Sequence, residues 1–312
     1  MPLNSQVQGF LQSLSAAGAP AFNTLQPAQC RQAINTLMSM MPPSQAVLAQ
    51  VRDTHIPGPA GEMKVRIYTP TGTGPFPILM YFHGGGFVIG DLDTFDKLCR
   101  ETCGGAGVVV VSVDYRLAPE HPFPAASDDC LAATRWAAAH AAELNGDASR
   151  IGVSGDSAGG NLAAVTALRL RDEGGPALKA QLLVYPVTDA DPDAYPSMTA
   201  NAEGYLLSRA DMNWFFGHYV KDASAVASPI LCPIKAASHA GLPPALVITA
   251  EFDPLRDEGD AYAKKLAAAG VAVEHRCYDG AIHGFYTFFG ALSLGREAVD
   301  QGIGWLKRTL VA

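Results

Sequence analysis

Four consecutive valines at 108–111 restrict the fold of this chain more than any other feature of its sequence. β-Branched residues favour strands, and a strand that is apolar on both faces must be covered on both faces. Helical stretches at 127–144, 161–172 and 258–269 alternate with short runs of this kind. The alternation predicts an α/β protein with a mostly parallel central sheet covered by helices. The expected strands lie at 51–56, 63–68, 78–82, 108–114, 150–153, 182–185, 246–250 and 271–278.

Two stretches do not fit a simple alternation of strands and helices. Residues 1–45 show apolar side chains at helical spacing twice, and a pair of prolines ends the second run. Between the sixth and seventh strands lie roughly sixty residues, too many for a plain crossover, and they include an expected helix at 208–219. We therefore expect 1–45 and 188–220 to form two parts of one helical cap over the carboxyl edge of the sheet. The α/β core would comprise 46–187 and 221–312.

The first two strands are joined by a turn at 57–61 that is rich in proline and glycine. A turn this short connects antiparallel neighbours, because parallel strands need a longer crossover. The two strands should therefore form an antiparallel hairpin at one edge of the sheet.

Composition narrows the possible partners. Hydrophobic residues make up 48% of the 312 residues and charged residues 17%, so a sizeable core can be built. A formal charge of −8 without any run of Lys or Arg excludes a nucleic-acid or anionic-membrane surface. The start of the chain lacks the pattern of a signal peptide. A helix that spans a membrane needs about 18 consecutive apolar residues, and no segment has a run of that length. We expect a cytoplasmic protein that binds small neutral molecules.

Six cysteines are dispersed along the chain, and only Cys99 and Cys103 are closely spaced. Their spacing matches neighbouring positions on one helix. Neither a second pair nor nearby histidines follow to complete a zinc site. We expect buried free thiols, no metal and no cofactor.

The pentapeptide GDSAG at 155–159 is a weak signal by itself, but its context is specific. It directly follows the expected strand at 150–153 and precedes the helix at 161–172, which is the order of a nucleophile elbow. A serine hydroxyl is a poor nucleophile at neutral pH and needs a strained turn and an adjacent base. Gly155 and Gly159 would allow the tight turn. Ser157 is therefore the candidate nucleophile, with a helix N-cap as the alternative interpretation.

A second motif, HGGGF at 83–87, follows the strand at 78–82. Three glycines in succession can direct backbone N–H groups at one atom. Such donors, together with the N–H of Ala158 after the nucleophile, stabilise the oxyanion of a tetrahedral intermediate. The alternative, a phosphate-binding loop, would need the Lys and Ser/Thr that are absent here.

An acid and a base should follow, each just past the carboxyl end of a strand. Asp253 follows the strand at 246–250, whereas its rival Asp257 lies in the start of the next helix, where a solvated position is expected. His283 follows the last strand, and Gly284 after it allows a close approach to the elbow. We therefore expect Asp253 and His283 to complete a triad with Ser157.

HGGGF, the segment DYRLAPEHPFPA at 114–125, GDSAGG and DPLRDE at 253–258 together closely resemble the bacterial hormone-sensitive-lipase-like carboxylesterases, family IV of the α/β-hydrolase superfamily. The resemblance runs from about residue 50 to the C-terminus, and residues 1–45 resemble that family's cap in position only. It implies an eight-stranded α/β-hydrolase sheet under a helical cap, with Gly85, Gly86 and Ala158 as oxyanion donors. It also implies cis peptide bonds before Pro119 and Pro124 and favours a homodimer through the last strand.

The predicted function is hydrolysis of small-molecule carboxylic esters with short to medium acyl chains, through an acyl-enzyme on Ser157. An amidase or arylformamidase using the same triad is one alternative. A ligand sensor is another, and it is disfavoured because a related group of plant hormone receptors has lost the histidine that stands here as His283. The expected substrate-binding residues are Phe87, Asp156, Trp214 and Phe215, with Phe215 pointing into the acyl pocket.

Overall fold

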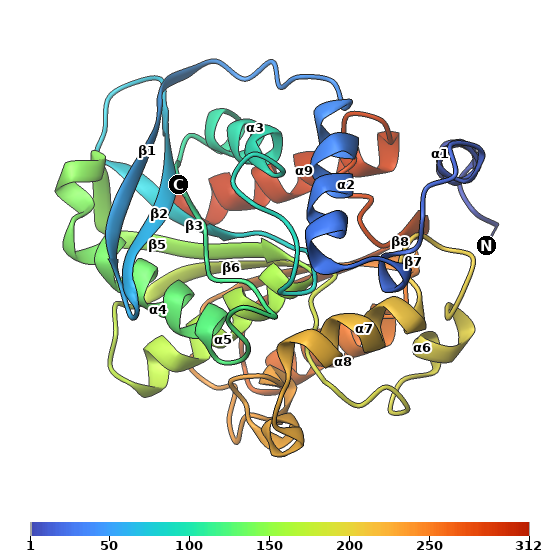
Figure 1. Ribbon diagram of the computed structural model, residues 1–312. Helices are drawn as coiled ribbons and strands as arrows, with labels where there is room; N and C mark the ends of the chain where they lie inside the picture. The colour runs from blue at the N-terminus through green and yellow to red at the C-terminus, as the bar shows by residue number, and fades with distance from the viewer. Residues whose placement is uncertain (1, 312) are drawn as a thin grey trace.

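The computed structural model describes residues 2–311 and is built around one eight-stranded sheet (Figure 1). The spatial order of the strands is β1-β2-β4-β3-β5-β6-β7-β8. β1 pairs antiparallel with β2 and β2 with β4, and all other pairs are parallel. The predictions of a mostly parallel sheet and an edge hairpin are therefore confirmed. The strands are β1 (Leu48–Gly58), β2 (Gly61–Pro70), β3 (Phe76–Phe82), β4 (Val109–Val113), β5 (Gly146–Asp156), β6 (Leu178–Val184), β7 (Ala245–Phe252) and β8 (Val273–Ile282).

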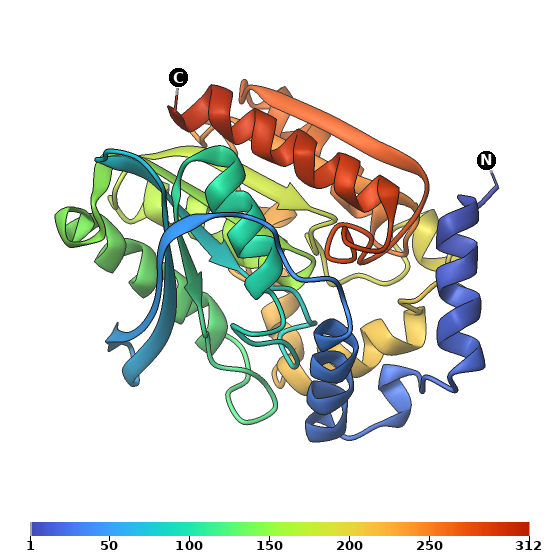
Figure 2. The same ribbon diagram turned by 90° about the horizontal axis from the view of Figure 1, so that it is seen from above.

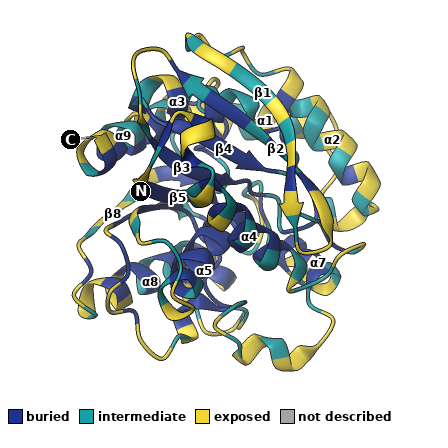
Figure 3. Ribbon diagram, turned by 90° about the vertical axis from the view of Figure 1, so that its left-hand side faces the viewer, coloured by how far each residue is buried: buried dark blue, intermediate teal, exposed yellow. Residues whose placement is uncertain are grey.

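The alternating side chains of β3 show why the strand sequences are almost wholly apolar. Ile78, Met80 and Phe82 belong to a core on one face of the sheet, together with side chains of α4, α5 and α8. Leu79 and Tyr81 belong to the core on the other face, with side chains of α3 and α9. The sheet is thus buried on both faces, and Figure 3 shows its inner strands buried while β1 is partly exposed at the edge.

The helices cover the two faces of the sheet and the carboxyl ends of its strands (Figure 2). Their bounds are α1 (Ser5–Ala16), α2 (Pro27–Ser39), α3 (Asp96–Ala106), α4 (Ala125–Ala139), α5 (Ala158–Asp172), α6 (Pro196–Ala200), α7 (Arg209–Tyr219), α8 (Arg256–Ala268) and α9 (Ser293–Leu306). Short 3₁₀ segments are η1 (Phe22–Thr24), η2 (Ala141–Leu144), η3 (Ala223–Ala227) and η4 (Pro233–Lys235), and a π-helical turn, η5 (Lys307–Val311), follows α9. None of the helices within residues 2–311 has the length and apolar composition that crossing a membrane requires.

The N-terminal segment and the insert after β6 contact each other above the carboxyl ends of the strands. The backbone N–H of Asn23 donates to Asp211 Oδ1 of α7 at 3.0 Å, and the Phe22 ring lies 5.8 Å from that of Phe215. Arg31 of α2 attaches the N-terminal segment to the core, because its guanidinium donates to the carbonyl oxygens of Val88 and Ala118. Two segments far apart in the sequence therefore pack on each other above the carboxyl ends of the strands (Figure 1).

Several local expectations can be compared directly with the structure. The peptide bonds before Pro119 and Pro124 are cis, as predicted, and so is the bond before Pro75. Cys99 and Cys103 both lie buried on α3, and all six cysteines are free thiols. The single helix expected at 127–144 is instead α4 followed by η2, with His140 as the residue between them.

Candidate active site

The turn between β5 and α5 presents Ser157 at the carboxyl edge of the sheet. Ser157 has φ 55° and ψ −119°, a backbone conformation that side-chain-bearing residues rarely adopt. The neighbouring glycines make this turn possible: a Cβ on Gly155 would overlap the Gly159 carbonyl, and one on Gly159 would overlap the Phe82 carbonyl. Ser157 is also the N-cap residue of α5, so the positive end of the helix dipole lies beneath its side chain.

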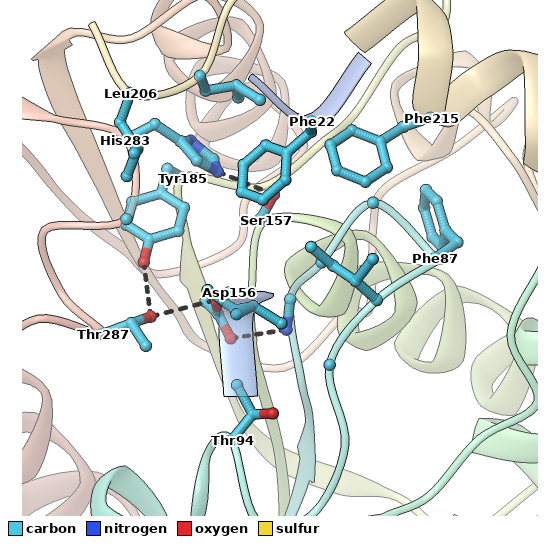
Figure 4. Close-up of a pocket in the computed structure, with 18 of the residues that line it drawn as sticks. Phe22, Phe87, Thr94, Asp156, Ser157, Tyr185, Leu206, Phe215, His283 and Thr287 are labelled. Atoms are coloured by element: carbon cyan, nitrogen blue, oxygen red, sulfur yellow. Dashed lines mark hydrogen bonds between the residues drawn. The ribbon is translucent and has the colours of Figure 1, made fainter. Parts of the chain in front are cut away.

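His283 and Asp253 reach Ser157 from the ends of two other strands. Figure 4 shows the His283 ring beside Ser157. His283 Nε2 lies 3.0 Å from Ser157 Oγ, and His283 Nδ1 lies 2.7 Å from Asp253 Oδ2. A carboxylate can only accept, so Nδ1–H donates to Asp253 and leaves Nε2 of the neutral ring to accept the serine proton. Asp253 is fully buried, and its Oδ1 accepts the backbone N–H of Leu255 at 2.8 Å.

Asp257, the sequence rival of Asp253, is held elsewhere. Its carboxylate accepts the backbone N–H of Ser197 and pairs with Arg256 Nε, each at 2.8 Å. The structure therefore brings Asp253 to the histidine and keeps Asp257 at the start of α8.

Each glycine of the HGGG segment lies where a Cβ would overlap a different neighbour. A side chain on Gly84 would overlap the Asp156 carboxylate, and one on Gly85 would overlap the Ile89 carbonyl. A side chain on Gly86 would overlap the Phe215 ring. Gly85 and Gly86 also have φ of 115° and 59°, which favour glycine. The loop can therefore lie close to Ser157, with Gly85, Gly86 and Ala158 as the candidate oxyanion donors.

His83 supports this loop from behind. Its ring is fully buried between Tyr115, at 4.2 Å, and Phe95, at 5.4 Å, and Nδ1 lies 2.7 Å from the Gly84 carbonyl oxygen. Burial lowers the pKa of His83 to about 4, so the ring is neutral at neutral pH. A neutral ring with Nδ1–H donating to Gly84 fixes the carbonyl at the start of the loop.

A largely apolar cleft opens over Ser157, and Gly84–Gly86, Asp156 and His283 all line it. Residues of the N-terminal segment and of the insert after β6 supply much of its wall: Phe22, Ile34, Met38, Leu206, Leu207, Met212, Phe215 and Phe216. Among residues 2–311, no group of three or more His, Cys, Asp or Glu side chains is arranged to hold a metal ion.

The four predicted substrate-binding residues have different surroundings. Phe87 and Phe215 line the cleft, and the Phe87 ring stacks on Tyr219 at 4.0 Å. Trp214 does not line it: its ring packs against Phe215 and His218, and Phe216 lines the cleft beside Phe215. A contact between Trp214 and the substrate therefore stays a prediction.

Asp156 also lines the cleft, but its carboxylate is occupied by protein groups. Oδ1 accepts Tyr81 Oη–H at 2.6 Å and the Gly84 backbone N–H at 3.0 Å, and Oδ2 lies 3.5 Å from Thr287 Oγ1. Sequence reasoning did not identify Tyr81, Thr287 or Tyr185, whose ring lies 4.4 Å from that of His283. None of them stands in a recognisable motif, so no local signal could have indicated them.

With this geometry described, comparison with known proteins identifies the family. A family model described as the α/β-hydrolase fold matches residues 79–287. The chain belongs to the α/β-hydrolase fold family. The sequence is 49% identical over 253 residues to carboxylic ester hydrolase LipN of Mycobacterium tuberculosis, covering 79% of this chain and 67% of the relative. It is 46% identical over 278 residues to esterase LipI of the same organism, covering 86% and 85%.

Comparison with solved structures supports the same family. A hyperthermophilic esterase from the archaeon Pyrobaculum calidifontis superposes with a TM-score of 0.94 at 41% identity, over 100% of both chains. The predicted α/β-hydrolase fold and the resemblance to hormone-sensitive-lipase-like carboxylesterases are therefore confirmed.

Proposed function

We propose that the protein is a serine carboxylesterase that hydrolyses small-molecule esters with short to medium acyl chains. The observation that carries the proposal is the hydrogen-bonded line from Asp253 through His283 to Ser157, beneath the glycine loop 84–86. Relatives at 46–49% identity are named as an esterase and a carboxylic ester hydrolase, which supports the same reaction class.

In the acylation step, Ser157 Oγ attacks the ester carbonyl carbon while His283 Nε2 accepts the hydroxyl proton. The carbonyl oxygen becomes an oxyanion, which the backbone N–H groups of Gly85, Gly86 and Ala158 would bind. The intermediate collapses when the bond to the leaving oxygen breaks and His283 returns its proton to that oxygen, releasing the alcohol. Asp253 stabilises the imidazolium that exists between the two transfers.

Deacylation repeats the route with water. His283 accepts a proton from a water molecule whose oxygen attacks the acyl carbon of the Ser157 ester. When the second tetrahedral intermediate collapses, Ser157 Oγ leaves and recovers its proton from His283. The products are a carboxylic acid and free enzyme, so the reaction consumes one water and needs no cofactor.

The cleft supports the substrate class. Its walls are mainly apolar, which suits an alkyl acyl chain more than a charged group. Bulky side chains from two separate segments, including Phe22 and Phe215, close it above the serine and limit the chain length that it can hold.

The test is hydrolysis of p-nitrophenyl butyrate by the purified protein and by Ser157→Ala. We expect the variant to fold normally and to lose activity by about 10⁴-fold or more, because the hydroxyl supplies chemistry and little packing. A matched p-nitroanilide in parallel separates an esterase from an amidase. Unchanged turnover in the variant, or faster cleavage of the anilide, would reject the proposal.

Two finer features belong to the same proposal. We infer a homodimer through β8, one of the two outermost strands of the sheet, where Glu274 and Arg276 are exposed and the Asn4 N–H donates to the carbonyl oxygen of Gly280 at one end. Sedimentation that shows a monomer at all concentrations would contradict the dimer. A cytoplasmic location stays a prediction, and cell fractionation would test it.

A further inference from the structure

Asp156 is a buried carboxylate in the middle of the site that the mechanism above does not use. It has 4% exposure and directly precedes Ser157, yet no step assigns its side chain a role. A buried charge is costly unless its environment satisfies it, so its presence here needs a physical reason.

The carboxylate contacts three segments that must be aligned for catalysis, and Figure 4 shows the contact with Thr287. Oδ1 accepts from Tyr81 of β3 and from the backbone N–H of Gly84 at the start of the glycine loop. Oδ2 lies 3.5 Å from Oγ1 of Thr287, four residues after His283. Thr287 Oγ1 is in turn 3.2 Å from Tyr185 Oη, and the Tyr185 ring packs on His283.

The contact with Gly84 is a hydrogen bond, and it is so close that only glycine fits at position 84. The carboxylate accepts the Gly84 N–H, and it also fills the space that a Cβ on Gly84 would need. The loop can therefore not move away from Asp156 without breaking the bond, and no residue with a Cβ fits at position 84. The N–H groups of the next two residues are the proposed oxyanion donors, so their position relative to Ser157 depends on this contact.

We propose that Asp156 is a positioning residue that holds the oxyanion loop at a fixed position relative to Ser157. This inference rests on the proposed ester hydrolysis. The role is geometric: a negative charge near the oxyanion would oppose its formation, so the useful property is the acceptor Oδ1. Burial raises the pKa of Asp156 to about 6, while the hydrogen bonds from Tyr81 and Gly84 stabilise the carboxylate. Oδ1 can accept these bonds whether or not the group is ionised.

The substitutions Asp156→Asn and Asp156→Ala separate geometry from charge. Asparagine keeps Oδ1 and can donate from Nδ2 to Thr287, whereas alanine removes both the acceptor and the atoms that pack against Gly84. We expect Asp156→Ala to lower kcat for p-nitrophenyl butyrate by about 10²–10³-fold, the cost of a misplaced oxyanion donor, with KM changed less than about threefold. Asp156→Asn should retain kcat within about tenfold of the wild type.

Two further readouts respond to the oxyanion and not to general damage. Affinity for a trifluoromethyl ketone, which forms a charged tetrahedral adduct on serine, should fall in parallel with kcat. The labelling rate of Ser157 by a fluorophosphonate should fall by a similar factor. Labelling does not depend on which ester the protein prefers, so it tests the inference even if the wild type proves inactive on esters, which would reject the proposed function instead.

A double-mutant cycle tests whether Asp156 acts through Gly84. Gly84→Ala should push the loop away from Asp156 and lower kcat with little change in KM, and the double variant should lose much less than the sum of the two single losses. If Asp156→Ala does not fold, Gly84→Ala and Asp156→Asn carry the same test. Equal loss in Asp156→Asn and Asp156→Ala, full activity in Asp156→Ala, or strictly additive losses would overturn the proposal.

Discussion

Asp253 and Asp257 lie four residues apart on the same stretch of chain, but their surroundings differ. Asp253 is fully buried against His283, whereas Asp257 pairs with Arg256 and accepts a backbone N–H. We expect Asp253→Asn to lower kcat by on the order of 10³–10⁴-fold, because the imidazole loses the partner that fixes its tautomer.

Asp257→Asn is the matched control for this prediction, since it changes the same atoms without reaching the histidine. It should lower kcat by less than about tenfold, as expected for a residue outside the triad. Steady-state kinetics on p-nitrophenyl butyrate measure both variants. A larger loss in Asp257→Asn would move the acid of the triad to that residue.

We expect Glu258 to make the stability of the protein depend on pH. Its side chain is buried, with Oε1 accepting the Thr188 backbone N–H at 2.6 Å, and burial raises the pKa of Glu258 to about 8. Above its ordinary pKa the unfolded chain has released this proton, while the folded protein keeps it up to about pH 8. Stability should therefore fall as the pH rises from about 4.5 to 8.

Glu258→Gln removes the titrating group but keeps an oxygen that can accept from Thr188. One pKa unit corresponds to about 1.4 kcal/mol, so the variant should lack a pH-dependent loss of up to several kcal/mol. Urea unfolding at pH 5, 6.5 and 8 would measure the difference between the two proteins. Glu143→Gln, on the exposed surface of η2, is the control and should behave like the wild type. Parallel curves for wild type and Glu258→Gln would contradict the assignment.

The proposed catalytic residues could be identified from sequence because each stands at a strand end. Ser157 follows β5, Asp253 follows β7, and His283 follows β8, so a short apolar run and the turn after it locate all three. Asp156 stood in the same motif, but its partners did not. Tyr81 and Thr287 lie 75 and 131 residues away, and only the pairing of β3 with β5 and the turn after β8 bring them to it.

At the scale of elements, α9 shows where periodicity alone was insufficient. Its sequence contains Gly295, Gly302 and Gly304, which disfavour a helix in isolation. A Cβ on Gly295 would overlap the Phe285 carbonyl, and one on Gly302 would lie 2.7 Å from Tyr286 Oη. Gly295 and Gly302 therefore allow α9 to pack closely on residues 285–286, so their low helix propensity is explained by a tertiary contact.

α7 offers a test of how the cap sets the pocket. Phe215 is buried and lies against Gly86, whereas Trp214 packs on His218 away from the cleft. Each methylene that gains a buried site contributes about 0.8 kcal/mol, or roughly fourfold in kcat/KM. We expect Phe215→Ala to shift the preferred acyl chain by about two carbons toward longer esters and to destabilise the protein by about 3 kcal/mol or more.

Trp214→Ala is the matched variant, because it removes a large ring from the same helix without changing the lining of the cleft. Its profile of kcat/KM across p-nitrophenyl esters should keep the wild-type maximum. A shift in Trp214→Ala with none in Phe215→Ala would mean that the sequence expectation for Trp214 was right.

At the scale of the whole molecule, the two segments predicted to form the cap hold each other over the cleft. Asn23 bonds Asp211 on α7, Phe22 packs near Phe215, and Arg31 fixes α2 to the core. Sequence indicated both segments by their helical spacing and by the length of the insert. It could not indicate the contacts between the two segments, such as the bond from Asn23 to Asp211, which lie 188 positions apart.

The packing of these two segments on each other helps to predict whether the enzyme acts at an oil surface. A lipase activated at an interface needs a mobile lid that exposes a broad apolar face. Within residues 2–311, the exposed large apolar side chains are Met40, Val47, Val226 and Val311, and none of them lies on α7. Opening the cap would also break the contacts between its two segments and the links of Arg31.

We therefore expect the enzyme to act on dissolved esters and to prefer acyl chains of up to about eight carbons, since the gain of about 0.8 kcal/mol per methylene stops where the aromatic wall ends. kcat/KM for p-nitrophenyl esters from acetate to palmitate should rise, pass through a maximum and fall. Tributyrin assayed below and above its solubility limit should give a rate that saturates with dissolved substrate. A maximum at palmitate, or a jump in rate when the emulsion forms, would show that the cap opens as a lid and that its aromatic residues do not set the chain length.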